Sequence, residues 1–142
     1  MHLLDTNVVS ELRKVSAGRA DANVAAWAAG VPSGQLFISV VTLHDLEHGV
    51  LLAERSDPRA GAILRRWLDD SVARAFDGRI LSVDQAVARV AAAFHVPDPA
   101  PFRDALIGAT AKVHGLVMVT RNERDYERVA GIRVLNPWRV VT

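Results

Sequence analysis

The sequence contains no cysteine among its 142 residues. A chain without thiols forms no disulfide bonds, binds no zinc through thiolates and has no cysteine nucleophile, and it fits a reducing cytosol. The first residues carry no basic region, and no apolar run approaches the roughly 20 residues of a membrane span. We therefore expect a cytoplasmic protein that does not cross a membrane.

The sequence has no large excess of basic or acidic residues, and it lacks several common catalytic motifs. The 17 basic and 16 acidic residues leave a formal net charge of +1, so any nucleic-acid surface must be a local patch. The sequence has no G-x-G-x-x-G or Walker phosphate loop and no G-x-S-x-G nucleophile elbow. A carboxylate-bound metal ion is the catalytic device that the remaining residues offer.

Short β-branched runs alternate with longer helical patterns along the chain. Strands are predicted at residues 2–5, 36–41, 80–83, 116–120 and 132–136. Helices are predicted at residues 7–14, 21–30, 42–55, 58–76, 84–95 and 102–114. Thr42 is the predicted cap of the third helix, with Asp45 in a capping-box position. The alternation predicts one α/β domain, residues 1–142, with a mostly parallel sheet of about four or five strands flanked by helices.

Four aspartates lie near the ends of predicted strands or at the start of a predicted helix: Asp5, Asp45, Asp104 and Asp125. The strand ends of an open α/β sheet converge on one crevice, so we expect these side chains to gather there. Gathered carboxylates repel one another unless a cation lies among them, and carboxylate oxygens are ligands of Mg²⁺. Each aspartate alone could instead cap a helix, interact with a helix dipole or be a solvated loop charge. Together they predict a metal site.

The segment H-D-L-E-H at 44–48 leaves two choices open. Glu47 competes with Asp45, but the two point about 160° apart on a helix. Asp45 lies nearer the strand end, so we favour Asp45. The same segment matches the H-x-x-E-H pattern of a zinc peptidase, with His44 and His48 on one helix face. That interpretation needs a third ligand and a peptide cleft, and it is a remote alternative.

Basic residues near the same edge are candidates for holding the phosphates of a nucleic acid, although arginines on helices are often simply solvated. They are Arg13, Lys14, Arg103, Arg121 and Arg124. The three tryptophans are better suited to anchor the core or an interface than to stack on bases.

Four segments of the chain, taken in order, resemble the PIN domain. They are L-L-D-T-N-V-V-S-E-L at 3–12, I-S-V-V-T-L-H-D-L-E-H-G-V at 38–50, R-D-A-L-I-G-A-T-A at 103–111 and L-V-M-V-T-R-N-E-R-D-Y at 116–126. With N-P-W at 136–138, they look most like the VapC-type toxins of bacterial and archaeal toxin–antitoxin pairs. The resemblance implies a Mg²⁺- or Mn²⁺-dependent endoribonuclease that forms a homodimer. It also implies inhibition by a small antitoxin, which itself binds DNA.

The resemblance further implies roles for individual residues. Asp5 and Asp104 match the family's most dependable metal ligands, and Asp45 and Asp125 would complete the catalytic site. Asp45 stands where the family usually has the longer Glu, so it is a direct or a water-bridged ligand. The fourth acidic position varies in the family between the sites of Asn122 and Asp125. Residues implied to surround the metal or contact RNA are Thr6, Asn7, Thr120, Arg121 and Asn122.

A partner-binding PIN domain with weak or no catalysis is the main alternative to the nuclease. The shorter Asp45 favours this alternative, because it would reach a metal less readily than Glu. RNA cleavage by the purified protein distinguishes the two.

Overall fold

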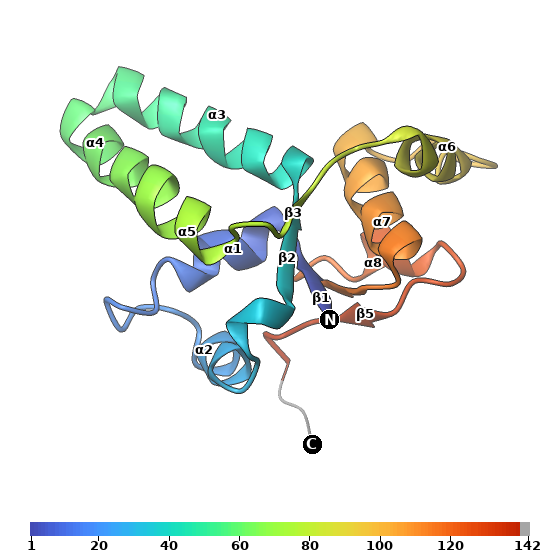
Figure 1. Cartoon of the computed structure of the whole chain (residues 1–142), viewed down its shortest axis with the longest axis horizontal. Coiled ribbons are helices and arrows are strands. Elements are labelled where there is room, and N and C mark those ends of the chain that lie inside the picture. Colours follow the sequence, from blue (N-terminus) through green and yellow to red (C-terminus); the bar gives the residue numbers. More distant parts are fainter. Residues whose placement is uncertain (140–142) are drawn as a thin grey trace.

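The computed structural model describes residues 1–139, and residues 140–142, the end of the predicted domain, lie outside the described residues. A five-stranded sheet with the order β3-β2-β1-β4-β5 forms its centre (Figure 1). All neighbouring pairs are parallel. The strands are β1 (His2–Leu4), β2 (Leu36–Ser39), β3 (Ile80–Leu81), β4 (Val117–Val119) and β5 (Val134–Leu135). The predicted α/β class with a mostly parallel sheet is confirmed.

Helices connect the strands and lie on both sides of the sheet (Figure 1). They are α1 (Thr6–Leu12), α2 (Ala22–Ala29), α3 (Val40–Ser56), α4 (Pro58–Arg66), α5 (Ala73–Ala75), α6 (Gln85–Ala93), α7 (Phe102–His114) and α8 (Arg124–Glu127). A 3-10 turn spans Ser33–Gln35, and a π-helical turn, Trp67–Val72, joins α4 to α5. The chain thus interrupts the predicted helix 58–76 and adds a short helix, α8, that was not predicted. The alternative of Asp125 as a loop charge is therefore wrong.

Helix α3 begins earlier than predicted. Ser39 is its cap, and the Ser39 hydroxyl oxygen accepts a hydrogen bond from the Val41 backbone N–H at 3.0 Å. Thr42 is fully buried inside the helix, so the predicted cap at Thr42 and its capping box with Asp45 are wrong. The β-branched pair Val40 and Val41 resembles a continuing strand, but tertiary packing overrides this local preference. Asp45 consequently lies in the second turn, where its side chain is free to contact other elements.

Helices α3 and α4 form a tightly packed hairpin. Asp57 caps α4 by accepting a hydrogen bond from the Ala60 backbone N–H at 3.3 Å, and Pro58 occupies the first position, as predicted. Gly61 allows the close approach, because a Cβ there would lie 2.4 Å from the Glu54 Cα. The hairpin is therefore built around a position that accepts no side chain.

Two core clusters lie on opposite faces of the sheet. Leu4 of β1 packs with Val8 of α1 and Leu46 of α3 in one cluster. Leu3 of β1 packs with Ile107 of α7 in the other. Successive residues of a strand point to opposite faces, so a sheet covered on both sides needs unbroken apolar strands. Among residues 1–139, no helix has the length and apolar character to cross a membrane.

Candidate functional site

Asp5 follows the last residue of β1 and caps α1. Its Oδ1 accepts a hydrogen bond from the Thr6 backbone N–H at 2.8 Å. Its Oδ2 accepts hydrogen bonds from the Thr120 hydroxyl at 2.8 Å and the Tyr126 hydroxyl at 3.1 Å. Asp5 is 6% exposed, and burial raises the pKa of its carboxyl although the three hydrogen bonds act in the opposite direction. Asp5 is therefore both a helix cap and a buried acid.

Tyr126 contacts this site and was missed by the sequence-based interpretation. It lies in α8 and is fully buried, and its hydroxyl donates to Asp5. Burial, followed by the charges of Asp5 and Asp104, raises the pKa of the Tyr126 phenol, which stays a neutral donor. Gly108 leaves room for the ring, because a Cβ there would lie 3.0 Å from Tyr126 Cδ1. The only sequence signal was a lone tyrosine after Asp125, which has no spacing pattern to identify its partner.

Asp104 lies half-buried in the first turn of α7. Burial raises its pKa from 3.8 to about 6, and repulsion from Asp5 and Asp125 contributes to the rise. Arg103 lowers the pKa of Asp104, while Asp45 raises it slightly further. The charges of Asp5, Asp125 and Asp45 thus reach Asp104, although within residues 1–139 no three of these carboxylates are arranged to hold a metal ion as they stand.

Both oxygens of Asp45 have partners. Asp45 Oδ1 accepts a hydrogen bond from Arg103 Nη1 at 2.7 Å, and Asp45 Oδ2 accepts one from the Thr6 hydroxyl at 3.0 Å. The Asp45 side chain is 15% exposed and that of Arg103 is 62% exposed. Arg103, a predicted phosphate contact, is thus paired with one of the aspartates.

The predicted neighbours of the metal ligands lie in the segments that follow β1 and β4, two adjacent strands. The Thr120 hydroxyl accepts a hydrogen bond from the Asn122 backbone N–H at 3.0 Å while it donates to Asp5. Asn7 Oδ1 accepts a hydrogen bond from the Arg121 backbone N–H at 3.4 Å. These bonds tie the segment after β4 to the start of α1.

An open polar pocket of about 570 Å³ lies beside Asp125. Its lining includes Arg121, Arg124 and Arg139. The Arg121 guanidinium carbon lies 5.2 Å from the centre of the Trp138 ring, a cation–π contact. The lining also includes Glu123, Asp125 and Glu127, and Arg139 pairs with Glu123 at 3.1 Å, so basic and acidic side chains are balanced around this pocket.

A comparison with known protein families shows which family the chain belongs to. The sequence model of the PIN domain matches residues 2–132. The chain belongs to the PIN domain family. It is 33% identical to the VapC ribonuclease Y4jK of Sinorhizobium fredii, and the match covers 97% of this chain and 98% of that protein. It is also 33% identical to the Toxin FitB of Neisseria gonorrhoeae, over 97% of this chain and 99% of FitB.

A solved structure agrees with the sequence relatives. The crystal structure of FitAcB from Neisseria gonorrhoeae matches this PIN domain with a TM-score of 0.88 and 31% identity, over 99% of this chain and 100% of that one. The predicted resemblance to the PIN domain and to VapC-type toxins is confirmed.

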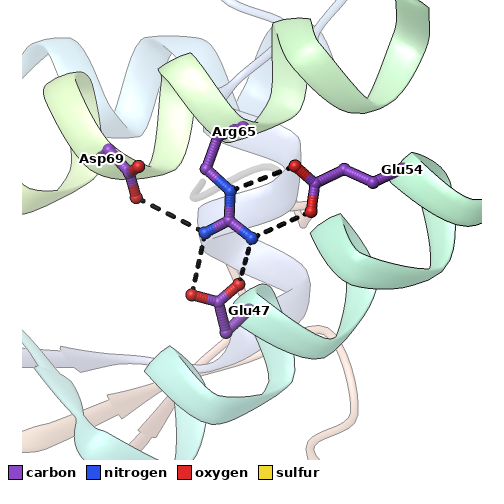
Figure 2. Close-up of polar contacts among 4 residues, drawn as sticks. All are labelled: Glu47, Glu54, Arg65 and Asp69. Atoms are coloured by element: carbon purple, nitrogen blue, oxygen red, sulfur yellow. Dashed lines mark hydrogen bonds and ion pairs between the residues drawn. The ribbon is translucent and has the colours of Figure 1, made fainter. Parts of the chain in front are cut away.

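Glu47 of this PIN domain points toward α4, where Arg65 binds it (Figure 2). Arg65 Nη1 and Nη2 donate to the two Glu47 carboxylate oxygens at 2.9 Å and 2.6 Å. Arg65 also contacts Glu54 at 3.0 Å and Asp69 at 3.6 Å. The hydrogen bonds from Arg65 lower the pKa of Glu47. Glu47 is therefore a partner of α4, which agrees with our preference for Asp45 as the site residue.

The two histidines of the zinc alternative have exposed rings on the surface of α3. The rings of His44 and His48 lie 6.4 Å apart, and His44 Nδ1 lies 3.8 Å from Asp45 Oδ1. Throughout residues 1–139, no three His, Asp or Glu side chains lie close enough to hold a metal ion as they stand. The zinc interpretation thus lacks a third ligand in the part of the chain that the structure describes.

The aspartates fit a divalent cation by their chemistry. They are oxygen donors, and the raised pKa values of Asp5 and Asp104 reflect burial and mutual repulsion that a cation would relieve. Mg²⁺ binds proteins through only one or two carboxylates and keeps several of its waters, so it does not need a closed protein cage.

Proposed function

We propose that this protein is the ribonuclease toxin of a toxin–antitoxin pair, a Mg²⁺- or Mn²⁺-dependent endoribonuclease that hydrolyses RNA phosphodiester bonds. The observation that carries the proposal is Asp104, whose pKa is raised by burial and by the charges of three further aspartates, Asp5, Asp125 and Asp45. The names of the relatives, VapC ribonuclease and Toxin FitB, support the same activity.

Asp5 and Asp104 would hold the metal ion, with Asp45 and Asp125 completing the site directly or through water. When bound, the ion would lower the pKa of a water and stabilise negative charge on the phosphodiester. Thr6, Thr120 and Tyr126 fix the orientation of the Asp5 carboxylate through the hydrogen bonds described above.

Residues around the metal ligands would carry out proton transfer and bind the RNA. Asp125 or Asp45 would accept the proton of the attacking water as the general base. Arg121 and Arg124 would bind RNA phosphates in the pocket beside Asp125, which predicts salt-sensitive binding. RNA shape and unpaired bases would select the substrate, because phosphate contacts carry no sequence information.

The partners would be RNA, a cognate antitoxin that inhibits the site, and a second copy of the chain in a cytoplasmic homodimer. DNA would be reached only through the antitoxin. The structure of FitAB bound to an IR36 DNA fragment, 28% identical with a TM-score of 0.88, supports this assembly. The DNA-bound VapBC of Salmonella typhimurium, 25% identical with a TM-score of 0.66, gives the same support.

A partner-binding domain with weak catalysis is the second candidate. It is favoured by the engagement of both Asp45 oxygens by Arg103 and Thr6. RNA cleavage by the purified protein is the test, measured with Mg²⁺, with Mn²⁺ and with EDTA.

We expect cleavage to require the divalent ion and to fall at least roughly hundredfold in Asp5→Asn and Asp104→Asn. Glu47→Gln is the matched control, because it removes a carboxylate that faces Arg65, and it should cleave like the wild type. Equal cleavage by Asp104→Asn would overturn the nuclease proposal. Inactivity of the wild type on many RNAs, together with tight antitoxin binding, would select the second candidate.

A further inference from the structure

Arg103 is exposed, yet its guanidinium contacts a much less exposed carboxylate. The contact joins Arg103 Nη1 to Asp45 Oδ1 at 2.7 Å, and the two residues are 58 positions apart in the sequence. A single guanidinium nitrogen makes this bond. The 62% exposure of the Arg103 side chain leaves the rest of the group facing solvent beside Asp104.

Thr6 links Asp45 to Asp5. Its backbone N–H donates to Asp5 Oδ1 and its hydroxyl donates to Asp45 Oδ2. If Arg103 left Asp45, the Thr6 hydroxyl would still hold Asp45 near Asp5. Only Asp45 Oδ1 would change its partner.

We propose that Arg103 is a positioning residue that pairs with Asp45 in the free protein and with an RNA phosphate in the complex. The exchange releases Asp45 Oδ1 toward the metal site. This inference rests on the proposed nuclease function and assigns Arg103 a regulatory part in it.

The strength of the pair allows the exchange. An exposed ion pair contributes roughly 0.2–1 kcal/mol, so a competing anion can displace it. A phosphate can accept two parallel hydrogen bonds from a guanidinium, which is stronger than the single bond to Asp45. Arg65 offers the contrast, because it is only 28% exposed and contacts three carboxylates, so an incoming phosphate would have to replace them all.

The exchange predicts that nucleic acid and metal bind cooperatively. In the free protein, Arg103 competes with the metal ion for Asp45. A bound phosphate removes that competition, so it strengthens metal binding, and by reciprocity the metal strengthens nucleic-acid binding.

Calorimetric titration of the full chain with Mn²⁺ tests the first half of the proposal. Arg103→Gln should bind Mn²⁺ roughly fivefold more tightly than the wild type without nucleic acid. Arg124→Gln is the charge control for this titration, in which no RNA is present for Arg124 to bind. It removes the same charge at the same edge, and Arg124 makes no ion pair within residues 1–139. An equal gain in Arg124→Gln would overturn the proposal, since net charge alone would then explain both.

The same titration with a short single-stranded oligodeoxynucleotide tests the exchange. The oligonucleotide should tighten Mn²⁺ binding by the wild type roughly fivefold and should leave Mn²⁺ binding by Arg103→Gln nearly unchanged. An equal effect on both proteins would overturn the proposal.

A double-mutant cycle shows whether Arg103 acts through Asp45. In an Asp45→Asn background, Arg103→Gln should no longer tighten Mn²⁺ binding, and a full effect there would contradict the proposal. The metal site itself is checked with Asp104→Asn. If the wild type binds Mn²⁺ no better than Asp104→Asn, the proposed function fails. If Asp104→Asn alone loses Mn²⁺ but Arg103→Gln has no effect, only the exchange fails.

Discussion

The carboxylates around Arg65 and the aspartates at the sheet edge differ in what neutralises them. In the first group, one guanidinium contacts three carboxylates, and the pKa of Glu47 is lowered. In the second group, Arg103 pairs with Asp45, and within residues 1–139 no ion pair joins a lysine or arginine to Asp5, Asp104 or Asp125. The pKa values of Asp5 and Asp104 are raised there. The same side-chain chemistry therefore has opposite electrostatic consequences in two parts of one small domain.

The difference separates a group that stabilises the fold from a group that is poised to bind a ligand. The Arg65 cluster, defined here as Arg65 with Glu47, Glu54 and Asp69, is held by contacts with a guanidinium of the chain itself and joins α3 to α4 (Figure 2). The aspartates are destabilised by their own repulsion, and strongly perturbed carboxylates are a common property of functional sites. Mutations that disturb the Arg65 cluster should then lower the stability of the protein, whereas removal of a charge among the four site aspartates should raise it.

The largest effect on stability is expected at the hairpin that the Arg65 cluster joins. Gly61→Ala should lower the free energy of unfolding by about 2 kcal/mol, because the new Cβ would lie 2.4 Å from the Glu54 Cα and force α4 away from α3. Urea denaturation measures the change. The shift would also lengthen the contacts of Arg65 with α3.

Gly49→Ala is the matched control in the same hairpin. Gly49 is an exposed residue within α3, and a Cβ there would meet no atom within 4 Å. Alanine should raise the free energy of unfolding by about 0.5–1 kcal/mol through its better helix propensity. If Gly61→Ala behaved like Gly49→Ala, the close approach of the two helices would not be a structural requirement.

The second-largest effect is a gain in the stability of the protein when one of the four site aspartates, Asp104, loses its charge. Asp104→Asn should stabilise the metal-free protein near neutral pH by about 1 kcal/mol. The pKa rise from 3.8 to about 6 corresponds to about 3 kcal/mol, which solvent screening of a half-exposed group reduces. The stability that protonation of Asp104 contributes is fully present below 3.8 and is lost as the pH rises through about 6. The gain should therefore grow as the pH rises from 3.8 and be complete above about pH 6.

Thermal unfolding at several pH values, with Mg²⁺ or with EDTA, measures this gain. Mg²⁺ should raise the Tm of the wild type near neutral pH and have little effect on Asp104→Asn. Its effect on the wild type should weaken as the pH falls below about 6, because protons then compete with the ion for Asp104. In EDTA, a Tm of Asp104→Asn below that of the wild type near neutral pH would mean that this aspartate supports the fold.

The sequence predicted the helices and strands around the site aspartates and around Arg65 better than it predicted the side-chain contacts there. Alternating apolar strands and helices determine the parallel sheet, and the positions of Asp5 and Asp104 relative to these elements bring them to one edge. The predicted start of α3 was wrong because Val40 and Val41 have strand propensity, whereas the Ser39 cap begins the helix at Val40.

The partners of the carboxylates could not be predicted, because they come from distant parts of the chain. Tyr126 reaches Asp5 across 121 positions, and Arg103 reaches Asp45 across 58. A periodic pattern identifies which face of a helix is apolar, but it does not identify which arginine meets which acid. The same limit made Glu47 a competitor of Asp45 until the position of Arg65 was known.

The smallest effect is expected from Arg65→Gln. Arg65 is partly exposed, and exposed ion pairs contribute little individually, so the Tm near neutral pH should fall by only about two or three degrees at low salt. The pKa of Glu47 is lowered in the folded protein, so the stabilisation is present above the usual value of 4.5 and is lost as the pH falls through the folded-state pKa. The difference between Arg65→Gln and the wild type should therefore shrink in acid and in high salt, as scanning calorimetry would record. RNA cleavage should survive the change, because Arg65 faces Glu47 and not the aspartates. A loss of cleavage by folded Arg65→Gln would show that the two groups of carboxylates are not independent.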